Sequence, residues 1–239
     1  MSSEILIIVP VYNEQGNVKP LIKGIYKFLK KKKTILFVND NSKDETELEI
    51  NQCQKKYKNI ILKNRKYKLG IGSAHKFALK WAYKEKYKII ITMDCDGTHH
   101  PKYIKQMTNI LIKKKFDIVS TNRFLKKNSL EDWSFWRRFL TTLRYIIINK
   151  LLNIRYDSSG AYRCYNSLNV KLSDILKAKN NSYSFFWEST YILNQKKYRI
   201  HEIPIDLPAR LAGTSKMEFK DIFLALYYLI IFYFKKNLN

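Results

Sequence analysis

Short apolar runs alternate with amphipathic stretches through the first half of the chain. The runs are rich in β-branched residues and predict strands at residues 5–9, 35–38, 59–63, 88–93 and 117–120. Between them, apolar residues recur at helical spacing over 18–29, 44–57, 73–86 and 101–114. Strands that alternate with helices indicate βαβ units, so we expect an α/β fold with a mostly parallel sheet flanked by helices.

After Asn122 the pattern becomes less regular and more aromatic. It predicts a basic, aromatic helix over 133–153, a loop over 157–165 that runs into a strand, a helix over 183–195, and a strand over 200–207. A basic, glycine-containing loop follows over 210–216. There is no internal repeat and no low-complexity linker, so we expect one domain over 1–218.

The last stretch, residues 219–239, predicts a separate hydrophobic helix. Ile222 to Phe234 is an unbroken apolar run of 13 residues, closed by Lys235 and Lys236. Such a run is shorter than the roughly 20 residues that cross a bilayer, and its aromatic residues favour the headgroup zone. We expect this helix to lie on a membrane surface; the alternative is a helix packed on the domain that precedes it.

Two carboxylates stand at the end of the strand predicted over 88–93. Asp94 and Asp96 lie where the strands of open α/β sheets bind ligands. Carboxylates this close repel each other unless a cation lies between them, and Mg²⁺ or Mn²⁺ held by substrate phosphates is the natural partner. The alternative is a loop of solvated acids that caps the helix expected at Pro101.

The same loop, Asp94 to Thr98, also resembles the nucleophile loop of haloacid-dehalogenase-type phosphatases, in which the first Asp attacks a phosphoryl group. In those enzymes the loop usually lies near the start of the chain. Here three βα units precede it, and the sequence offers neither a downstream acidic metal loop nor a separate cap.

The net charge of +25, from 45 Lys and Arg against 20 Asp and Glu, favours anionic partners: phosphorylated substrates, an anionic membrane surface or nucleic acid. A general bias toward Lys, Ile, Asn and Tyr accounts for part of this excess, and no nucleic-acid-binding fingerprint is present. Cys53, Cys95 and Cys164 lack metal-ligand spacing and fit a reducing cytosol. We expect no signal peptide, and a cytoplasmic protein that is peripheral on the cytoplasmic face of a membrane.

Three strand-end motifs, Pro10 to Glu14, Val38 to Ser42 and Asp94 to Asp96, together resemble family 2 glycosyltransferases with the GT-A fold. The second half adds Asp157 to Arg163, Ile203-Pro204-Ile205, and Arg210 with Gly213 to Met217. This larger set is similar to the dolichyl- and polyprenyl-phosphate mannosyltransferases. The resemblance covers about residues 4 to 217.

The resemblance implies a donor site for a nucleotide sugar. It assigns the base and ribose to Pro10, Tyr12, Glu14, Val38 and Asp40, with Cys95 beside the two acids. For Glu14 and Asp40, capping of the helices that follow is the alternative. Asp94, Asp96 and, more loosely, Thr98 would hold Mg²⁺ or Mn²⁺ with the donor diphosphate, while Arg123, Arg210 and Lys216 match diphosphate-binding positions.

The resemblance places the acceptor phosphate at Arg137 and Thr141, which share one helical face, with Arg138 and Arg163 as further basic groups. The aromatic stripe around them belongs either to this site or to the core. Asp96, Arg123 and Arg137 are the expected catalytic residues. A polyprenyl phosphate is already an anion, so we expect no indispensable general base, although Asp157 and Glu188 are candidates.

These inferences together predict an inverting hexosyltransferase that acts on a polyprenyl or dolichyl phosphate. Mannose from GDP-mannose is the default, and a UDP-hexose donor stays open. Another acceptor, such as a lipopolysaccharide or cell-wall sugar, is the alternative within the family. A phosphatase and a basic nucleic-acid-binding protein are the alternatives outside it.

Overall fold

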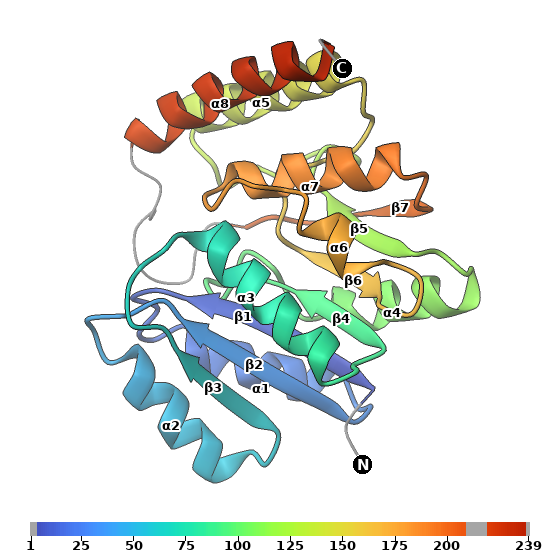
Figure 1. The fold of residues 1–239 in the computed structure, drawn as a ribbon. Coiled ribbons are helices and arrows are strands. Elements are labelled where there is room, and N and C mark those ends of the chain that lie inside the picture. The colour runs from blue at the N-terminus through green and yellow to red at the C-terminus, as the bar shows by residue number, and fades with distance from the viewer. Residues whose placement is uncertain (1–3, 209–218, 238–239) are drawn as a thin grey trace.

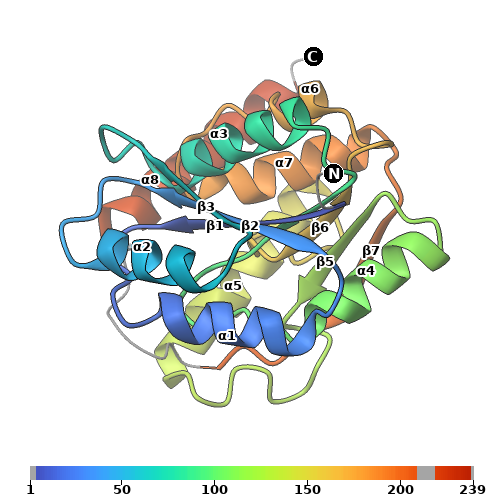
Figure 2. The same ribbon diagram turned by 90° about the horizontal axis from the view of Figure 1, so that it is seen from below.

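A computed structural model describes residues 4–208 and 219–237 and places a seven-stranded sheet at the centre of the molecule (Figures 1 and 2). The strand order is β3-β2-β1-β4-β6-β5-β7. The strands are β1 Ile5–Val11, β2 Lys33–Asn39, β3 Ile60–Asn64, β4 Ile89–Thr92, β5 Ile118–Asn122, β6 Arg163–Asn166 and β7 Ile200–Pro204. Only β6 runs antiparallel to its neighbours, so the predicted mostly parallel α/β fold is confirmed.

Helices cover both faces of the sheet. One face carries α1 Val18–Phe28, α2 Thr46–Lys56 and α4 Tyr103–Lys113; the other carries α3 Ile71–Lys84, α6 Leu172–Ile175 and α7 Ser184–Gln195. In β1, Ile5 and Ile7 pack into the first layer, whereas Leu6 and Ile8 pack into the second. A strand buried on both faces needs apolar residues at successive positions, which explains the continuous apolar runs in the sequence.

Two further helices, α5 Phe135–Leu152 and α8 Phe219–Asn237, lie side by side at one end of the molecule (Figure 1). Leu152 and Leu229 are buried where these helices meet α7, and Trp187 of α7 stacks against two aromatic residues of α8. The predicted C-terminal helix is therefore present, and one of its faces packs against α5 and α7. Across the two described segments, no helix is both long and apolar enough to cross a bilayer.

Most predicted boundaries differ from the structure by a few residues; two boundaries and one unpredicted helix are informative. Helix α4 begins at Tyr103, because Pro101 and Lys102 form a turn before it. Strand β7 ends at Pro204, although the main-chain N–H of Ile205 still donates to Asn122. The short α6 has no counterpart in the sequence pattern, since four residues are too few to show a helical period.

The ends of the parallel strands meet at one edge of the sheet. Strand β1 lies between β2 and β4, so the chain order reverses beside it, and ligands of open α/β sheets bind at such a reversal. Because β6 is antiparallel, the loop before it reaches the same edge as the loops after β4 and β5. Residues 157–162 therefore stand between the two acids of β4 and the residues that follow β5.

Candidate active site

The three predicted strand-end motifs lie next to one another, because β2, β1 and β4 are adjacent. The main-chain N–H of Asp40 donates to Val11, which fixes the end of β2 against the end of β1. The Asp40 carboxylate pairs with Arg65 at 3.1 Å and accepts from the main-chain N–H of Leu69. Asp40 thus holds the loop before α3 and does not cap α2, so the capping alternative is wrong for this residue.

Burial of Asp40 is close to complete, and this raises the pKa of its carboxyl group, against the opposing charge of Arg65. Glu14 accepts a 2.7 Å hydrogen bond from the side chain of Asn17, and its own main-chain N–H donates to Thr46. Glu14 therefore supports the turn into α1, and its place at the nucleotide stays a prediction.

Tyr12 presents its ring beside a basic loop. The Lys68 ammonium lies 4.1 Å from the ring centroid, a cation–π geometry. A half-buried aromatic ring at a strand end is suited to stacking on a nucleobase. Pro10, Val38 and Cys95, also predicted at the donor, are buried, and their assignment to the donor stays a prediction.

Asp94 and Asp96 follow β4 in a loop that its own residues hold rigid. Thr98 donates to Asp96 Oδ1 twice, from its hydroxyl group at 2.6 Å and from its main-chain N–H at 3.1 Å. His99 Nδ1 accepts from the main-chain N–H of Asp94 at 2.8 Å, and the His99 ring stacks on Tyr162. His99 therefore shapes the turn, as does His100, whose Nδ1 accepts from Lys102.

The chemistry of these residues fits a divalent cation that is shared with a substrate. The Asp94 side chain is 37% exposed, whereas Asp96 is buried and oriented by Thr98. Within 4–208 and 219–237, no group of three or more His, Cys, Asp or Glu residues forms a self-sufficient metal cage. Mg²⁺ is typically bound by one or two carboxylates, with substrate phosphates completing its shell, and the Asp94–Asp96 pair suits that arrangement.

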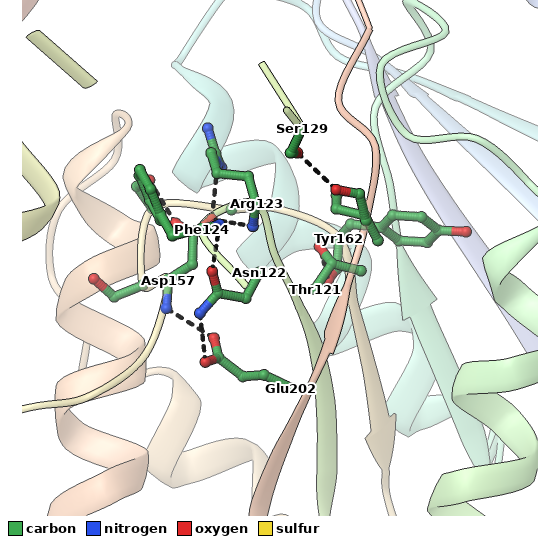
Figure 3. Close-up of polar contacts among 12 residues, drawn as sticks. Thr121, Asn122, Arg123, Phe124, Ser129, Asp157, Tyr162 and Glu202 are labelled. Atoms are coloured by element: carbon green, nitrogen blue, oxygen red, sulfur yellow. Dashed lines mark hydrogen bonds and ion pairs between the residues drawn. The ribbon is translucent and has the colours of Figure 1, made fainter. Parts of the chain in front are cut away.

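Arg123, directly after β5, forms a buried ion pair with Asp157 (Figure 3). Its Nε donates to Asp157 Oδ2 at 2.6 Å, and its main-chain N–H donates to the same oxygen. A Cβ atom built on Gly160 would lie 3.4 Å from Arg123 Nη2, so the glycine leaves room for the guanidinium group. Arg123 thus stands fixed beside the loop that precedes β6.

Helix α5 brings more arginines to the same place. Arg137 lies 3.6 Å over the ring of Trp133, and Thr141 follows one turn later. Arg138 and Arg123 line one hollow of about 230 Å³, which also contains Lys126 and Ser129. Of the predicted phosphate-binding residues, Arg138 therefore lies beside Arg123, and Arg137 and Thr141 lie on the same helix.

Arg144 was not predicted, although it continues the spacing of Arg137 and Thr141 by a further turn of the helix. It donates to Ser159 at 3.3 Å, and Ser159 donates to Asp157. Burial and then the charge of Arg123 lower the pKa of Arg144 to about 10. Two guanidinium groups that share one carboxylate leave excess positive charge for an anionic ligand.

The aromatic stripe at the start of α5 is mostly not core. Trp133 is buried, but Phe135, Trp136 and Phe139 are 50 to 70% exposed. Of the two alternatives for this stripe, the core therefore holds only for Trp133. These rings and Leu140 form an apolar surface beside the arginines.

Arg163, predicted as a ligand of the acceptor phosphate, is used inside the fold. It is buried, and its guanidinium group donates to the main-chain oxygens of Gly160, Ser158 and Phe186 and to the Ser189 hydroxyl. Side chains of an antiparallel strand buried on both faces have no route to solvent. Arg163 therefore stabilises the loop 157–162 through these hydrogen bonds. This corrects the prediction that Arg163 binds the acceptor phosphate.

Glu188, one of the two candidate bases, also stabilises the fold through hydrogen bonds. Its carboxylate accepts from the main-chain N–H groups of Lys179 and Asn180 at 2.9 Å and from the Tyr228 hydroxyl of α8. The second candidate, Asp157, is paired with Arg123. Arg210 and Lys216, predicted at the diphosphate, lie outside the described residues, and their assignment stays a prediction.

This geometry agrees with the comparison with known proteins. The model of the glycosyl transferase family 2 domain matches residues 6–170, which include the three strand-end motifs, Arg123, and the α5 residues. The chain belongs to glycosyl transferase family 2. Membership excludes the phosphatase and nucleic-acid-binding alternatives as the primary activity, and it identifies this family 2 chain as an enzyme.

Two curated relatives align with most of the chain. The chain is 26% identical over 223 residues to the polyprenol monophosphomannose synthase of Mycolicibacterium smegmatis, covering 91% of this chain and 82% of the relative. It is 24% identical over 214 residues to the undecaprenyl-phosphate mannosyltransferase of Micrococcus luteus, covering 89% of this chain and 87% of the relative.

Solved structures confirm the GT-A fold. Glucosyl-3-phosphoglycerate synthase from Mycobacterium tuberculosis, in complex with Mn²⁺, uridine diphosphate and glucosyl-3-phosphoglycerate, matches with a TM-score of 0.62 and 14% identity, over 95% of this chain and 77% of that one. The same synthase with Mg²⁺ and uridine diphosphate matches with a TM-score of 0.61. At this identity the likeness concerns the fold alone.

Proposed function

We propose that this family 2 enzyme transfers a hexose, mannose by default, from a nucleotide sugar to a polyprenyl phosphate. The observation that carries the proposal is a contrast in charge. Both carboxylates considered as general bases, Asp157 and Glu188, are engaged by protein donors, whereas Arg123, Arg138 and Arg144 gather at the same edge of the sheet. Such a site is suited to a nucleophile that arrives as an anion and needs no deprotonation.

In this proposal the acceptor phosphate is held by Arg137 and Thr141 and directed at the anomeric carbon of the donor sugar. One phosphate oxygen forms the new C–O bond while the bond to the nucleoside diphosphate breaks, and the electron pair leaves with the diphosphate. Arg123 would accept the charge that develops there. Asp94 and Asp96 would hold Mg²⁺ or Mn²⁺, which offsets the negative charge of the leaving group.

The nucleotide would lie across the ends of β1 and β2, with its base on Tyr12 and its hydroxyl groups toward Asp40 and Glu14. The two named relatives support mannose and a polyprenyl phosphate as substrates. We further infer a peripheral position on the cytoplasmic face of a membrane, because the exposed apolar residues of α5 lie beside the arginines assigned to the lipid phosphate.

The test compares acceptors and donors directly. The full-length enzyme with Mn²⁺ is given GDP-mannose, UDP-glucose or no donor, and either a short polyprenyl phosphate or the matching free alcohol. We expect a mannosylated lipid phosphate from GDP-mannose and no product from the alcohol. Equal use of the alcohol would overturn the base-free mechanism and favour a sugar-hydroxyl acceptor, such as that of a lipopolysaccharide or wall polymer.

A further inference from the structure

Glu202, on β7, lies between two segments that are far apart in the sequence (Figure 3). It is paired with Ser120 across the parallel β5–β7 register. One carboxylate oxygen accepts from the side-chain amide of Asn122 at 2.7 Å, and the other accepts from the main-chain N–H of Asp157 at 2.7 Å. The Glu202 carboxylate therefore clamps the end of β5 to the loop that precedes β6.

Both residues that Glu202 holds adjoin Arg123. The Asp157 carboxylate accepts from the Nε and the main-chain N–H of Arg123, while Asn122, which precedes Arg123 in the chain, accepts at 2.7 Å from the main-chain N–H of Phe124. Asp157 therefore fixes the Arg123 side chain, and Asn122 fixes the turn of main chain that carries it. A change in the Glu202 contacts reaches Arg123 without any direct contact between the two side chains.

The geometry is selective for the ionised form of Glu202. Each oxygen faces an N–H donor at 2.7 Å, and a carboxylate accepts at both oxygens. Protonation places an O–H group on one of these oxygens, which then accepts more weakly from its N–H partner. The clamp is strongest when Glu202 carries its negative charge.

The groups around Glu202 make that charge costly. Burial comes first, and the nearby Asp157 carboxylate adds to it, so the pKa of Glu202 rises to about 7, against the opposing effects of its two N–H partners and Arg163. The charged and titratable groups that face it come from the loop before β6, from β6 and from α5. They are Asp157 with its partners Arg123 and Arg144, then Tyr156, Arg163 and Tyr145.

We propose that Glu202 is a positioning residue for the transfer reaction: in its ionised form it locks Asn122 and Asp157, and so holds Arg123 where the donor diphosphate binds. This inference rests on the assignment of Arg123 to the diphosphate under the proposed function. It predicts that the enzyme loses activity as pH falls through about 7, the pKa of Glu202.

The test combines Glu202→Gln, Glu202→Asp and the control Glu85→Gln, an exposed glutamate at the end of α3. Initial rates are measured from about pH 5.5 to about pH 9 with GDP-mannose, Mn²⁺ and a short polyprenyl phosphate. Glu202→Gln is expected to lower kcat/KM for the donor about tenfold, since one charged hydrogen bond is lost. The KM for the lipid phosphate should stay within about twofold.

The pH profile separates positioning from general support of the fold. The wild type and Glu85→Gln should lose activity on the acid side of about pH 7. In Glu202→Gln the rate should no longer fall on the acid side of pH 7. Glu202→Asp keeps the negative charge on a shorter side chain, so its rate should be lower at every pH but should still fall at acid pH. An unchanged acid limb in a folded Glu202→Gln enzyme overturns the proposal.

A double-mutant cycle with Arg123→Ala isolates the route of the effect. If Glu202 acts through Arg123, adding Glu202→Gln to Arg123→Ala lowers the rate by less than about twofold. A full tenfold loss in that background contradicts the proposal. If Arg123→Ala alone leaves donor use intact, the assignment of Arg123 under the proposed function fails instead, so the two failures are distinguishable.

Discussion

The exposed face of α8 gives a direct test of membrane association. Phe223, Tyr227, Ile230 and Phe234 recur at helical spacing and are 45 to 72% exposed. We predict that the double substitution of Phe223 and Tyr227 by Ser weakens binding to anionic vesicles. The reason is that these two rings are among the most exposed on the helix and are suited to the headgroup zone.

Point substitutions on the exposed face test membrane binding by α8 more cleanly than removal of the whole helix does. The opposite face of α8 buries Leu229, and the Tyr228 hydroxyl donates to Glu188. Truncation after Met217, the simplest design from sequence, would therefore uncover core residues as well as delete the exposed stripe. A truncated chain that no longer sediments with vesicles would not separate lost contact from lost packing.

The size of the effect follows from the exposed fractions. Full burial of an aromatic side chain is worth about 1.5 to 3 kcal/mol, and Phe223 and Tyr227 are 72% and 64% exposed. Insertion of the exposed part therefore contributes about 1 to 2 kcal/mol for each ring. The double variant should lose about 2 to 4 kcal/mol, or roughly 30- to 1,000-fold in partition coefficient.

The assay is co-sedimentation with vesicles of phosphatidylglycerol and phosphatidylcholine over a range of lipid concentrations. The matched control is Leu168→Ser, because Leu168 is 73% exposed but lies outside α5 and α8. The control should bind like the wild type, and thermal melts should coincide for all three proteins. Binding by the double variant within about threefold of the wild type would refute the membrane assignment of this face.

Four further predictions follow from the site. Asp96→Ala should abolish metal-dependent transfer and weaken donor binding, as measured by calorimetry with the nucleotide sugar and Mn²⁺; near wild-type turnover would contradict the metal assignment. Arg137→Ala should raise the KM for the lipid phosphate about tenfold, through loss of a charged hydrogen bond, with the donor KM unchanged. Glu188→Gln should keep measurable turnover but lower the free energy of unfolding by about 1 to 3 kcal/mol, because it braces main-chain N–H groups; a stable but inactive variant would contradict this. In the folded protein the pKa of Glu202 is raised to about 7. Below that pH the folded protein therefore keeps a proton on Glu202 that the unfolded chain has released. The bound proton adds to the free energy of unfolding at acid pH, and this contribution is lost as pH rises through about 7. Relative to Glu202→Gln, the wild type should therefore lose about 2.5 kcal/mol of unfolding free energy between about pH 5 and about pH 8, as followed by urea denaturation.

The sheet and the donor side of the site could be predicted from the sequence because their signals are local. Asp94 and Asp96 adjoin an apolar run, and Asp40 ends another, so a reader of the sequence places both at strand ends. Arg163 shows where local signals fail. An arginine after a polar loop that contains a glycine suggests a phosphate ligand, but strand β6 is buried on both faces, and only its place between β4 and β5 reveals that the guanidinium group faces inward.

The arginine side of the site depends instead on strand pairing across long stretches of the chain. Glu202 carries one local signal, an acid at the centre of a short strand, but its partners Asn122 and Asp157 are identified only by the β5–β7 pairing and by the reversed direction of β6. An antiparallel strand begins at the edge where its parallel neighbours end. Inserting β6 therefore brings the loop before it against the loops after β4 and β5, which gives Arg123 a fixed carboxylate partner at the edge where the metal-binding acids also lie.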